Sequence, residues 1–133
     1  MTKIHMLKIF FIIVSYKDTS EIIRLLGSIK NQTNNKNKFE VESIVVDNAY
    51  IEENKKLILK KFPKTTYLGM NVNVGFAKAV NKGIRLAIHK KADFVCLLNP
   101  DVKISADFTA ELLKRKIEIA GPIISYQKNG KTI

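Results

Sequence analysis

The chain has 133 residues, of which 46% are hydrophobic and 26% are charged, a composition that excludes a disordered or fibrous protein. We expect one domain spanning residues 1–133, because a chain of this length can bury one hydrophobic core but not two. The 23 basic and 12 acidic residues give a net charge of +11, which favours polyanionic partners such as nucleotide phosphates, nucleic acid or an anionic membrane surface.

Three apolar segments in the first half of the chain have the composition of β-strands, with many β-branched and aromatic side chains. They are residues 8–15, 41–46 and 65–68. Apolar side chains at helical spacing predict one helix after Asp18 and a second over residues 52–62. The side chains of the second helix that we expect to face inward are Leu57, Ile58 and Phe62.

The second half of the chain begins with a predicted helix over residues 76–89. Its expected apolar stripe comprises Phe76, Val80, Ile84, Leu86, Ala87 and Ile88. Residues 94–98 form a short apolar run between polar segments, which is typical of a strand buried on both faces of a sheet. Pro100 cannot continue a sheet ladder, so this strand ends at Asn99 and leaves Asp101 just beyond it.

A further helix beginning at Ser105 or Asp107 and an extended segment over residues 118–125 follow. The regular alternation of strands and helices predicts an α/β fold with a mostly parallel central sheet and helices on both faces. Cys96 is the only cysteine, so we expect an inert, buried thiol in a reducing compartment. Residues 7–14 are apolar but too few to cross a bilayer. We therefore expect a cytoplasmic protein, either free or at the inner face of the membrane.

Polar side chains follow three of the predicted strands at the point where each strand ends. They are Ser15 and Tyr16, then Asp47 and Asn48, and finally Asn99 and Asp101. In a parallel sheet these ends share one edge, where ligands of open α/β sheets bind. Such a cluster can hydrogen-bond a nucleobase and a ribose, and a carboxylate can hold a divalent cation that bridges phosphates. Asp47 alone is equally well explained as a turn residue or a helix cap.

The sequence lacks the glycine-rich phosphate loops of common nucleotide-binding enzymes. No dinucleotide-binding loop follows the first strand, and no Walker-type loop occurs, which argues against a standard dehydrogenase or P-loop enzyme. Four segments instead resemble, in order and spacing, the nucleotide-binding half of the family 2 glycosyltransferases, and most closely the rhamnosyltransferase-like subgroup. They are 14–16 (Val-Ser-Tyr), 45–49 (Val-Val-Asp-Asn-Ala), 73–83 (Asn-Val-Gly-Phe-Ala-Lys-Ala-Val-Asn-Lys-Gly) and 97–101 (Leu-Leu-Asn-Pro-Asp).

The resemblance implies a Rossmann-like GT-A fold and an inverting transfer from a UDP- or dTDP-sugar to a glycan or lipid-linked acceptor, as in cell-wall or polysaccharide biosynthesis. It implies Mg²⁺ or Mn²⁺ as cofactor, coordinated by Asp101, and a carboxylate of Asp47 that accepts from a nucleobase N–H. The residues that it assigns to nucleotide binding are Ser15, Tyr16, Asp47, Asn48, Asn73, Gly75, Asn81, Asn99 and Asp101.

Purely structural roles compete with some of these assignments. Tyr16 could be a half-buried core residue with a solvated hydroxyl group, and Asn81 could bond a loop carbonyl. Phe76 is better explained as a packing residue than as a ligand contact. Gly83 is expected to allow close packing of its helix on the sheet.

The resemblance covers nearly the whole chain but includes no candidate for the family's catalytic base, which lies in the acceptor-binding half. We therefore expect a truncated enzyme that carries donor binding only, with open apolar surface that could form a homodimer. A rival hypothesis from another class is a non-catalytic basic α/β module that binds nucleic acid or a protein partner. We consider nucleic acid the less favoured ligand, because the lysines are spread over several segments and form no arginine-rich block.

Overall fold

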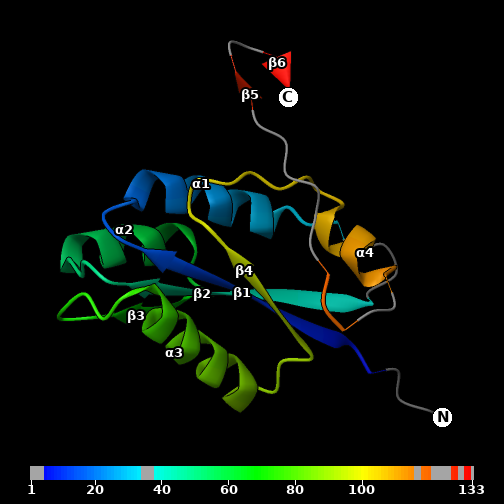
Figure 1. Cartoon of the computed structure of the whole chain (residues 1–133), viewed down its shortest axis with the longest axis horizontal. Coiled ribbons are helices and arrows are strands. Elements are labelled where there is room, and N and C mark those ends of the chain that lie inside the picture. Colours follow the sequence, from blue (N-terminus) through cyan, green and yellow to red (C-terminus); the bar gives the residue numbers. More distant parts are fainter. Residues whose placement is uncertain (1–4, 34–37, 116–117, 121–126, 129–130, 133) are drawn as a thin grey trace.

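The computed structural model describes residues 5–33, 38–115, 118–120, 127–128 and 131–132. A four-stranded sheet of order β3-β2-β1-β4 lies between two layers of helices, and all of its strands are parallel (Figure 1). The elements of the α/β unit are β1 Leu7–Ser15, α1 Thr19–Lys30, β2 Phe39–Asp47, α2 Glu52–Lys61, β3 Thr66–Gly69, α3 Phe76–His89, β4 Phe94–Leu98 and α4 Phe108–Leu113. This arrangement confirms the predicted α/β class with a parallel sheet.

The sheet separates two hydrophobic cores, because successive side chains of a strand point to opposite faces. On one face, Phe11 and Ile13 of β1 pack with the buried side of α1 and with Ile58 of α2. On the other face, Phe10 and Ile12 pack against α3. Figure 1 shows this division, with α1 and α2 above the sheet and α3 below it. β1 and β2 are the two inner strands, with a neighbouring strand on both sides and helices on both faces, and most of their residues are buried.

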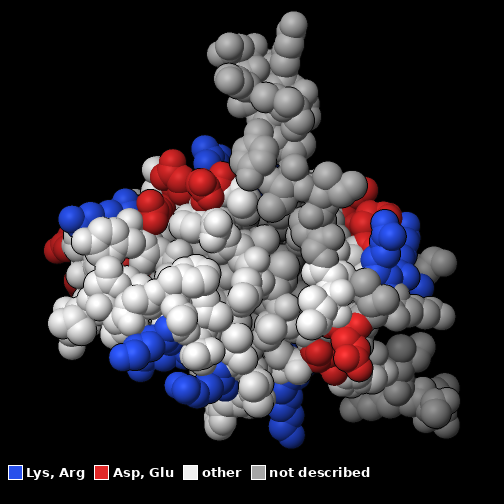
Figure 2. Space-filling view, in the orientation of Figure 1, with Lys and Arg blue, Asp and Glu red and all other residues white. Residues whose placement is uncertain are grey.

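The position of β4 differs from the prediction of a strand buried on both faces. β4 pairs only with β1 and forms an edge of the described sheet, crossing in front of β1 in Figure 1. Phe94, Val95 and Leu97 are consequently 43%, 40% and 48% exposed. Much of the described surface on this side is uncharged, and the charged groups lie towards its rim (Figure 2). The apolar run was diagnostic of a strand but not of its place in the sheet.

Three apolar side chains expected to face inward are exposed instead. Leu57 is 43% exposed, because the side chain of α2 that points into the core is Ile58. Phe76 and Ile88, at the two ends of α3, are 59% and 65% exposed, which corrects both their place in the apolar stripe and the expected packing role of Phe76. The central residues of the α3 stripe do face the sheet, with Val80 and Ala87 buried.

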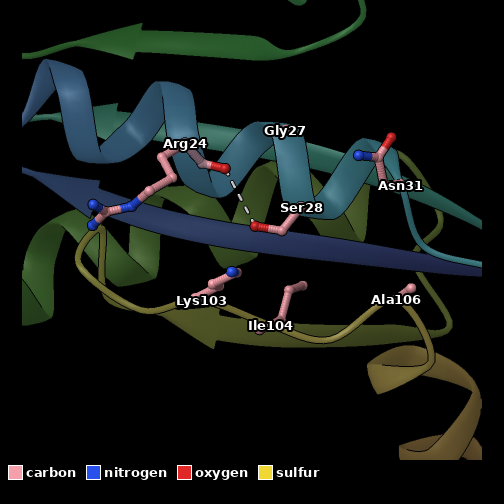
Figure 3. Close-up of a pocket in the computed structure, with 7 residues that line it drawn as sticks. All are labelled: Arg24, Gly27, Ser28, Asn31, Lys103, Ile104 and Ala106. Atoms are coloured by element: carbon pink, nitrogen blue, oxygen red, sulfur yellow. Dashed lines mark hydrogen bonds between the residues drawn. The ribbon is translucent and has the colours of Figure 1, made fainter. Parts of the chain in front are cut away.

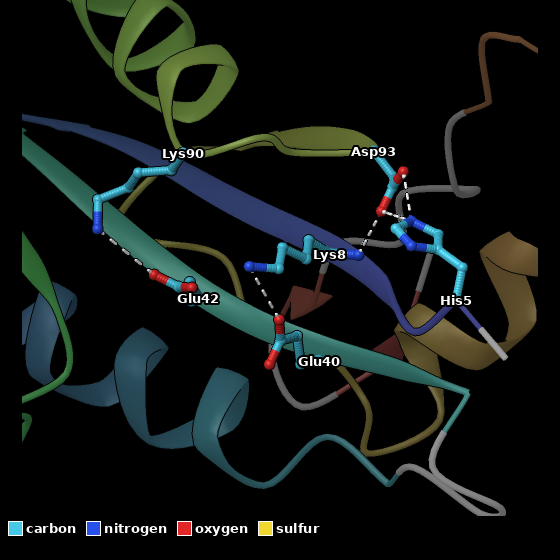
Figure 4. A network of polar contacts seen from close by, with 6 residues as sticks. All are labelled: His5, Lys8, Glu40, Glu42, Lys90 and Asp93. Carbon is cyan, nitrogen blue, oxygen red and sulfur yellow. Dashed lines mark hydrogen bonds and ion pairs between the residues drawn. The ribbon is translucent and has the colours of Figure 1, made fainter. Parts of the chain in front are cut away.

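Ion pairs and hydrogen bonds join the strands at the edge where their amino ends lie (Figure 4). Lys8 and Glu40 are register partners on β1 and β2, with 3.5 Å between Nζ and Oε1. The carboxylate of Asp93 precedes β4 and accepts from the Lys8 backbone N–H at 2.8 Å and from His5 Nε2 at 3.0 Å. The Lys8 N–H, and next the His5 ring, hold the pKa of Asp93 below its ordinary value. Charged side chains therefore connect β1 to β2 and to the residue that precedes β4.

Beyond α4, the extended segment expected over residues 118–125 falls mostly outside the described residues, and residues 118–120 are not in a strand. Two short antiparallel strands, β5 Gln127–Lys128 and β6 Lys131–Thr132, form a separate hairpin. Within the described part of the chain, none of the helices has the length and apolar character needed to cross a membrane.

Candidate functional site

The carboxyl ends of β1, β2 and β4 lie at one edge of the sheet, as the sequence predicted. Ser15 and Asp47 are register partners at the last positions of β1 and β2. Leu98, the last residue of β4, is paired with Ile13, so that Asn99 and the residues after it follow at the same edge. The Asn48 N–H also donates to the Ser15 carbonyl at 2.8 Å and extends the contact between β1 and β2 beyond the ladder. The sheet thereby brings together the three groups of polar residues.

The carboxylate of Asp47 is 4% exposed and has a hydrogen-bond donor on each oxygen. The Ala49 N–H donates to Oδ1 at 2.9 Å, which is the local turn bond expected of an aspartate at a strand end. The hydroxyl group of Tyr67, from β3, donates to Oδ2. The structure shows no ion pair for Asp47 within the described residues, so these neutral donors compensate its burial.

Tyr67 was not among the predicted site residues, and it lies 20 positions from Asp47 in the sequence. Burial of the phenol, followed by its hydrogen bond to the Asp47 carboxylate, raises the pKa of Tyr67 well above its ordinary value. The hydroxyl group therefore stays protonated and acts as a donor. The available sequence signal was weak: a tyrosine in a short strand following the one that ends in Asp47.

Asn48 connects the end of β2 to the loop that precedes α3. Its side-chain Oδ1 accepts from the Val74 N–H at 3.2 Å, and its Nδ2 donates to the Gly75 carbonyl at 3.5 Å. With 6% exposure, the Asn48 side chain lies mostly between these two segments. It thereby positions the loop next to the strand end.

The loop itself ends in a sharp turn at Gly75. The Gly75 N–H donates to Oδ1 of Asn73 at 2.9 Å, and Gly75 has a φ of 83°, a left-handed value that disfavours other residues. Gly75 occupies the N-cap position of α3, whose first backbone N–H groups are left without helical partners. The exposed side chain of Asn81 makes no hydrogen bond in the described part of the chain, so the alternative of a bond to a loop carbonyl is not observed.

Tyr16 lies just beyond β1 with 51% of its surface exposed and belongs to neither hydrophobic core, which argues against the alternative of a core residue. Its backbone N–H donates to Oδ2 of Asp18 at 3.0 Å, and Lys17 adopts a φ of 64°. The ammonium group of Lys17 lies 5.3 Å from the centre of the Tyr16 ring. An accessible aromatic ring with a neighbouring cation is thus present at the end of β1.

Asn99 and Asp101 are both exposed, and the carboxylate of Asp101 makes no hydrogen bond or ion pair within the described residues. No cluster of three or more histidine, cysteine, aspartate or glutamate side chains able to hold a metal occurs among those residues. One free carboxylate next to an amide oxygen still fits a Mg²⁺ or Mn²⁺ ion that takes its other ligands from phosphates and water. Asp101 would hold such an ion, and the amide oxygen of Asn99, two positions earlier in the sequence, is a candidate for a second ligand.

A hollow of about 370 Å³ lies between α1 and the segment after β4 (Figure 3). Its lining residues are Arg24, Gly27, Ser28, Asn31, Lys103, Ile104 and Ala106. None of them belongs to the predicted nucleotide site, and the candidate site is accordingly an open edge and not this hollow.

Comparison with protein families decides the identity of the domain. The profile described as glycosyl transferase family 2 matches residues 10–130. This chain belongs to glycosyltransferase family 2. The search of curated proteins gives no match.

Solved structures of glycosyltransferases share the fold of this family 2 chain. One is S. aureus TarS 1–349 in complex with UDP, with a TM-score of 0.65 and 23% identity over 81% of this chain and 31% of that chain. Another is the mannosyltransferase PcManGT from Pyrobaculum calidifontis in complex with GDP-Man and Mn²⁺, with a TM-score of 0.66 and 22% identity over 83% of this chain and 32% of that chain. The chain therefore spans about a third of each, and the similarity confirms the predicted GT-A fold.

Proposed function

We propose that this chain binds the nucleotide diphosphate of a sugar donor at the carboxyl ends of β1, β2 and β4, and that it serves metal-assisted, inverting glycosyl transfer. The observation that carries the proposal is the register of the sheet. It aligns Ser15 with Asp47 and ends β4 at Leu98, opposite Ile13, three residues before Asp101. The donors bound to related structures, UDP in TarS and GDP-Man with Mn²⁺ in PcManGT, support the same class of ligand.

Several residues of the edge and of the adjacent loop have a role in this proposal that suits their environment. The exposed ring of Tyr16 stacks on the base, and the fixed carboxylate of Asp47 accepts from a base N–H. Asn48 and Asn73 hold the loop at Gly75, so that the start of α3 lies over the nucleoside. Asn81 faces the ligand from the second turn of α3.

Asp101 takes the metal-binding role, since its carboxylate is exposed and unpaired within the described residues. A divalent cation held there supplies positive charge that stabilises the diphosphate as a leaving group. The donor is a UDP- or dTDP-sugar, and the acceptor is a glycan or a lipid-linked glycan.

Isothermal titration calorimetry with UDP, dTDP and GDP, each with Mn²⁺, tests the proposal. Asp101→Asn should weaken binding of the preferred nucleotide by at least about tenfold, because the variant loses the only charged metal ligand of the site. Asp93→Asn is the matched control: it removes the same charge from the other end of β4 and should leave the affinity unchanged. Absence of heat with all three nucleotides, or equal binding by the parent and Asp101→Asn, would refute the proposal.

A further inference from the structure

The hydrogen bond between Tyr67 and Asp47 joins two strands at the proposed base-binding position. Val45 and Tyr67 are register partners on β2 and β3, and Asp47 lies two residues beyond Val45 on the same face of its strand. Tyr67 packs against the core on the α1 and α2 side, so its hydroxyl group reaches along that face to the end of β2.

The two donors to Asp47 fix its carboxylate in different ways. The bond from the Ala49 N–H to Oδ1 is local, and by itself it leaves the terminal torsion of the aspartate free over a broad range. The bond from the Tyr67 hydroxyl to Oδ2 comes from another strand and removes that freedom. With both bonds present, the plane of the carboxylate is set by the sheet itself.

Both bonds leave acceptor capacity for a ligand. An ionised carboxylate has about four lone-pair sites, and the described residues use one on each oxygen. Because Asp47 is 4% exposed, only a small part of its surface is open to a ligand. The orientation of the remaining lone pairs then decides whether an in-plane N–H of a base can be accepted.

We propose that Tyr67 is a positioning residue for nucleobase recognition, which orients the Asp47 carboxylate towards a ring N–H of the bound base. This inference rests on the proposed function, since it presupposes that Asp47 accepts from the base. The protonated state of Tyr67, maintained by burial and by the carboxylate itself, keeps the hydroxyl group a donor at all pH values near neutrality.

Binding of UDP and of N3-methyl-UDP, each with Mn²⁺, to the parent and to Tyr67→Phe tests the inference. Tyr67→Phe should weaken UDP binding about three- to thirtyfold, since the substitution removes a hydrogen bond to a charged group. N3-methyl-UDP has no N–H at ring position 3, so its weaker binding to the parent should not change further in the variant. Tyr50→Phe is the matched control, because its hydroxyl group donates to Glu52 and not to Asp47.

The outcomes separate the two proposals. If the parent binds none of UDP, dTDP and GDP, the proposed function fails and the positioning role falls with it. If the parent prefers dTDP, whose base has the same ring N–H, dTDP and its N3-methyl analogue replace UDP and N3-methyl-UDP in the comparison. If the parent binds UDP and Tyr67→Phe binds it equally well, only the positioning role is overturned. An equal loss for UDP and N3-methyl-UDP, accompanied by a lower free energy of unfolding, would assign the hydroxyl group a structural role and would also overturn the inference.

Discussion

A Cβ atom added to Gly83 of α3 would lie 2.6 Å from Cγ2 of Ile12 in β1. Real Cβ atoms do not come this close to another heavy atom, so α3 packs on the sheet at a distance that only glycine allows. This contact confirms the expected packing role of Gly83. It also connects the motif of residues 73–83 to the buried centre of the fold, because the same helix begins at the Gly75 turn.

Replacement of Gly83 by alanine should lower the free energy of unfolding by about 1–3 kcal/mol, because Ile12 or the helix must shift. The matched control is Gly27→Ala in α1, where an added Cβ meets no atom within 4 Å. There the usual helix preference for alanine should raise the free energy of unfolding by about 0.5–1 kcal/mol. Urea unfolding monitored by circular dichroism measures both. Stabilisation by both replacements would show that α3 can move away from the sheet without cost.

Gly75→Ala should destabilise the protein by about 1–3 kcal/mol through backbone strain. The φ of 83° and ψ of 163° lie in a region open almost exclusively to glycine, and an added Cβ meets no atom within 4 Å. The cost is therefore conformational and not steric. The same urea titration gives the value, and UDP calorimetry with Mn²⁺ should show weaker binding because the start of α3 is displaced. A variant as stable as the parent would contradict the left-handed turn.

Cys96 is partly buried against one hydrophobic core, and not fully buried as expected from the sequence, because β4 is an edge strand of the described sheet. Its thiol should still react slowly with alkylating reagents in the folded protein. Burial raises its pKa to about 11, so at pH 8 the folded chain holds about a hundredfold less thiolate than an unfolded one. The alkylation rate of the folded protein should rise about tenfold per pH unit until it levels off near pH 11.

The raised pKa of the Cys96 thiol also makes the stability of the folded protein fall at alkaline pH. The folded state keeps the proton that the unfolded state releases, so this stabilisation is complete below the ordinary thiol pKa and is lost as the pH rises towards about 11. The stability of the parent relative to Cys96→Ala should therefore fall between pH 9 and pH 11. A constant difference over that range, or fast alkylation at pH 8, would show that the thiol is accessible.

Local sequence patterns were sufficient to predict most helices and strands of this fold. The bounds of α3 at Phe76 and His89 were predicted correctly, because the helix follows a glycine and its central apolar residues recur at helical spacing. The exposure of the apolar residues at the two ends of the helix could not be predicted. Whether Phe76 and Ile88 are buried depends on how far the sheet extends beneath them. For the same reason, the composition of β4 could not reveal that it is an edge strand.

The candidate site was predictable as far as it consists of strand ends. Parallel strands bring Ser15, Asp47 and Asn99 to one edge by rule, and the register bears this out. The bonds that orient these residues were not predictable, because Tyr67 reaches Asp47 from another strand and Asn48 reaches the loop at Val74. Contacts of this kind depend on strand order and register, which no local pattern encodes.

The edge position of β4 has a consequence for amide hydrogen exchange. In a strand paired on one side only, alternate backbone N–H groups point to the neighbour and away from it. Protection along β4 should therefore alternate with a period of two residues, slow for amides that bond β1 and fast for those that point outward. β1, paired on both sides, should show uniformly slow exchange. Any molecule that adds a strand to this edge would abolish the alternation, and its arrival could be followed residue by residue.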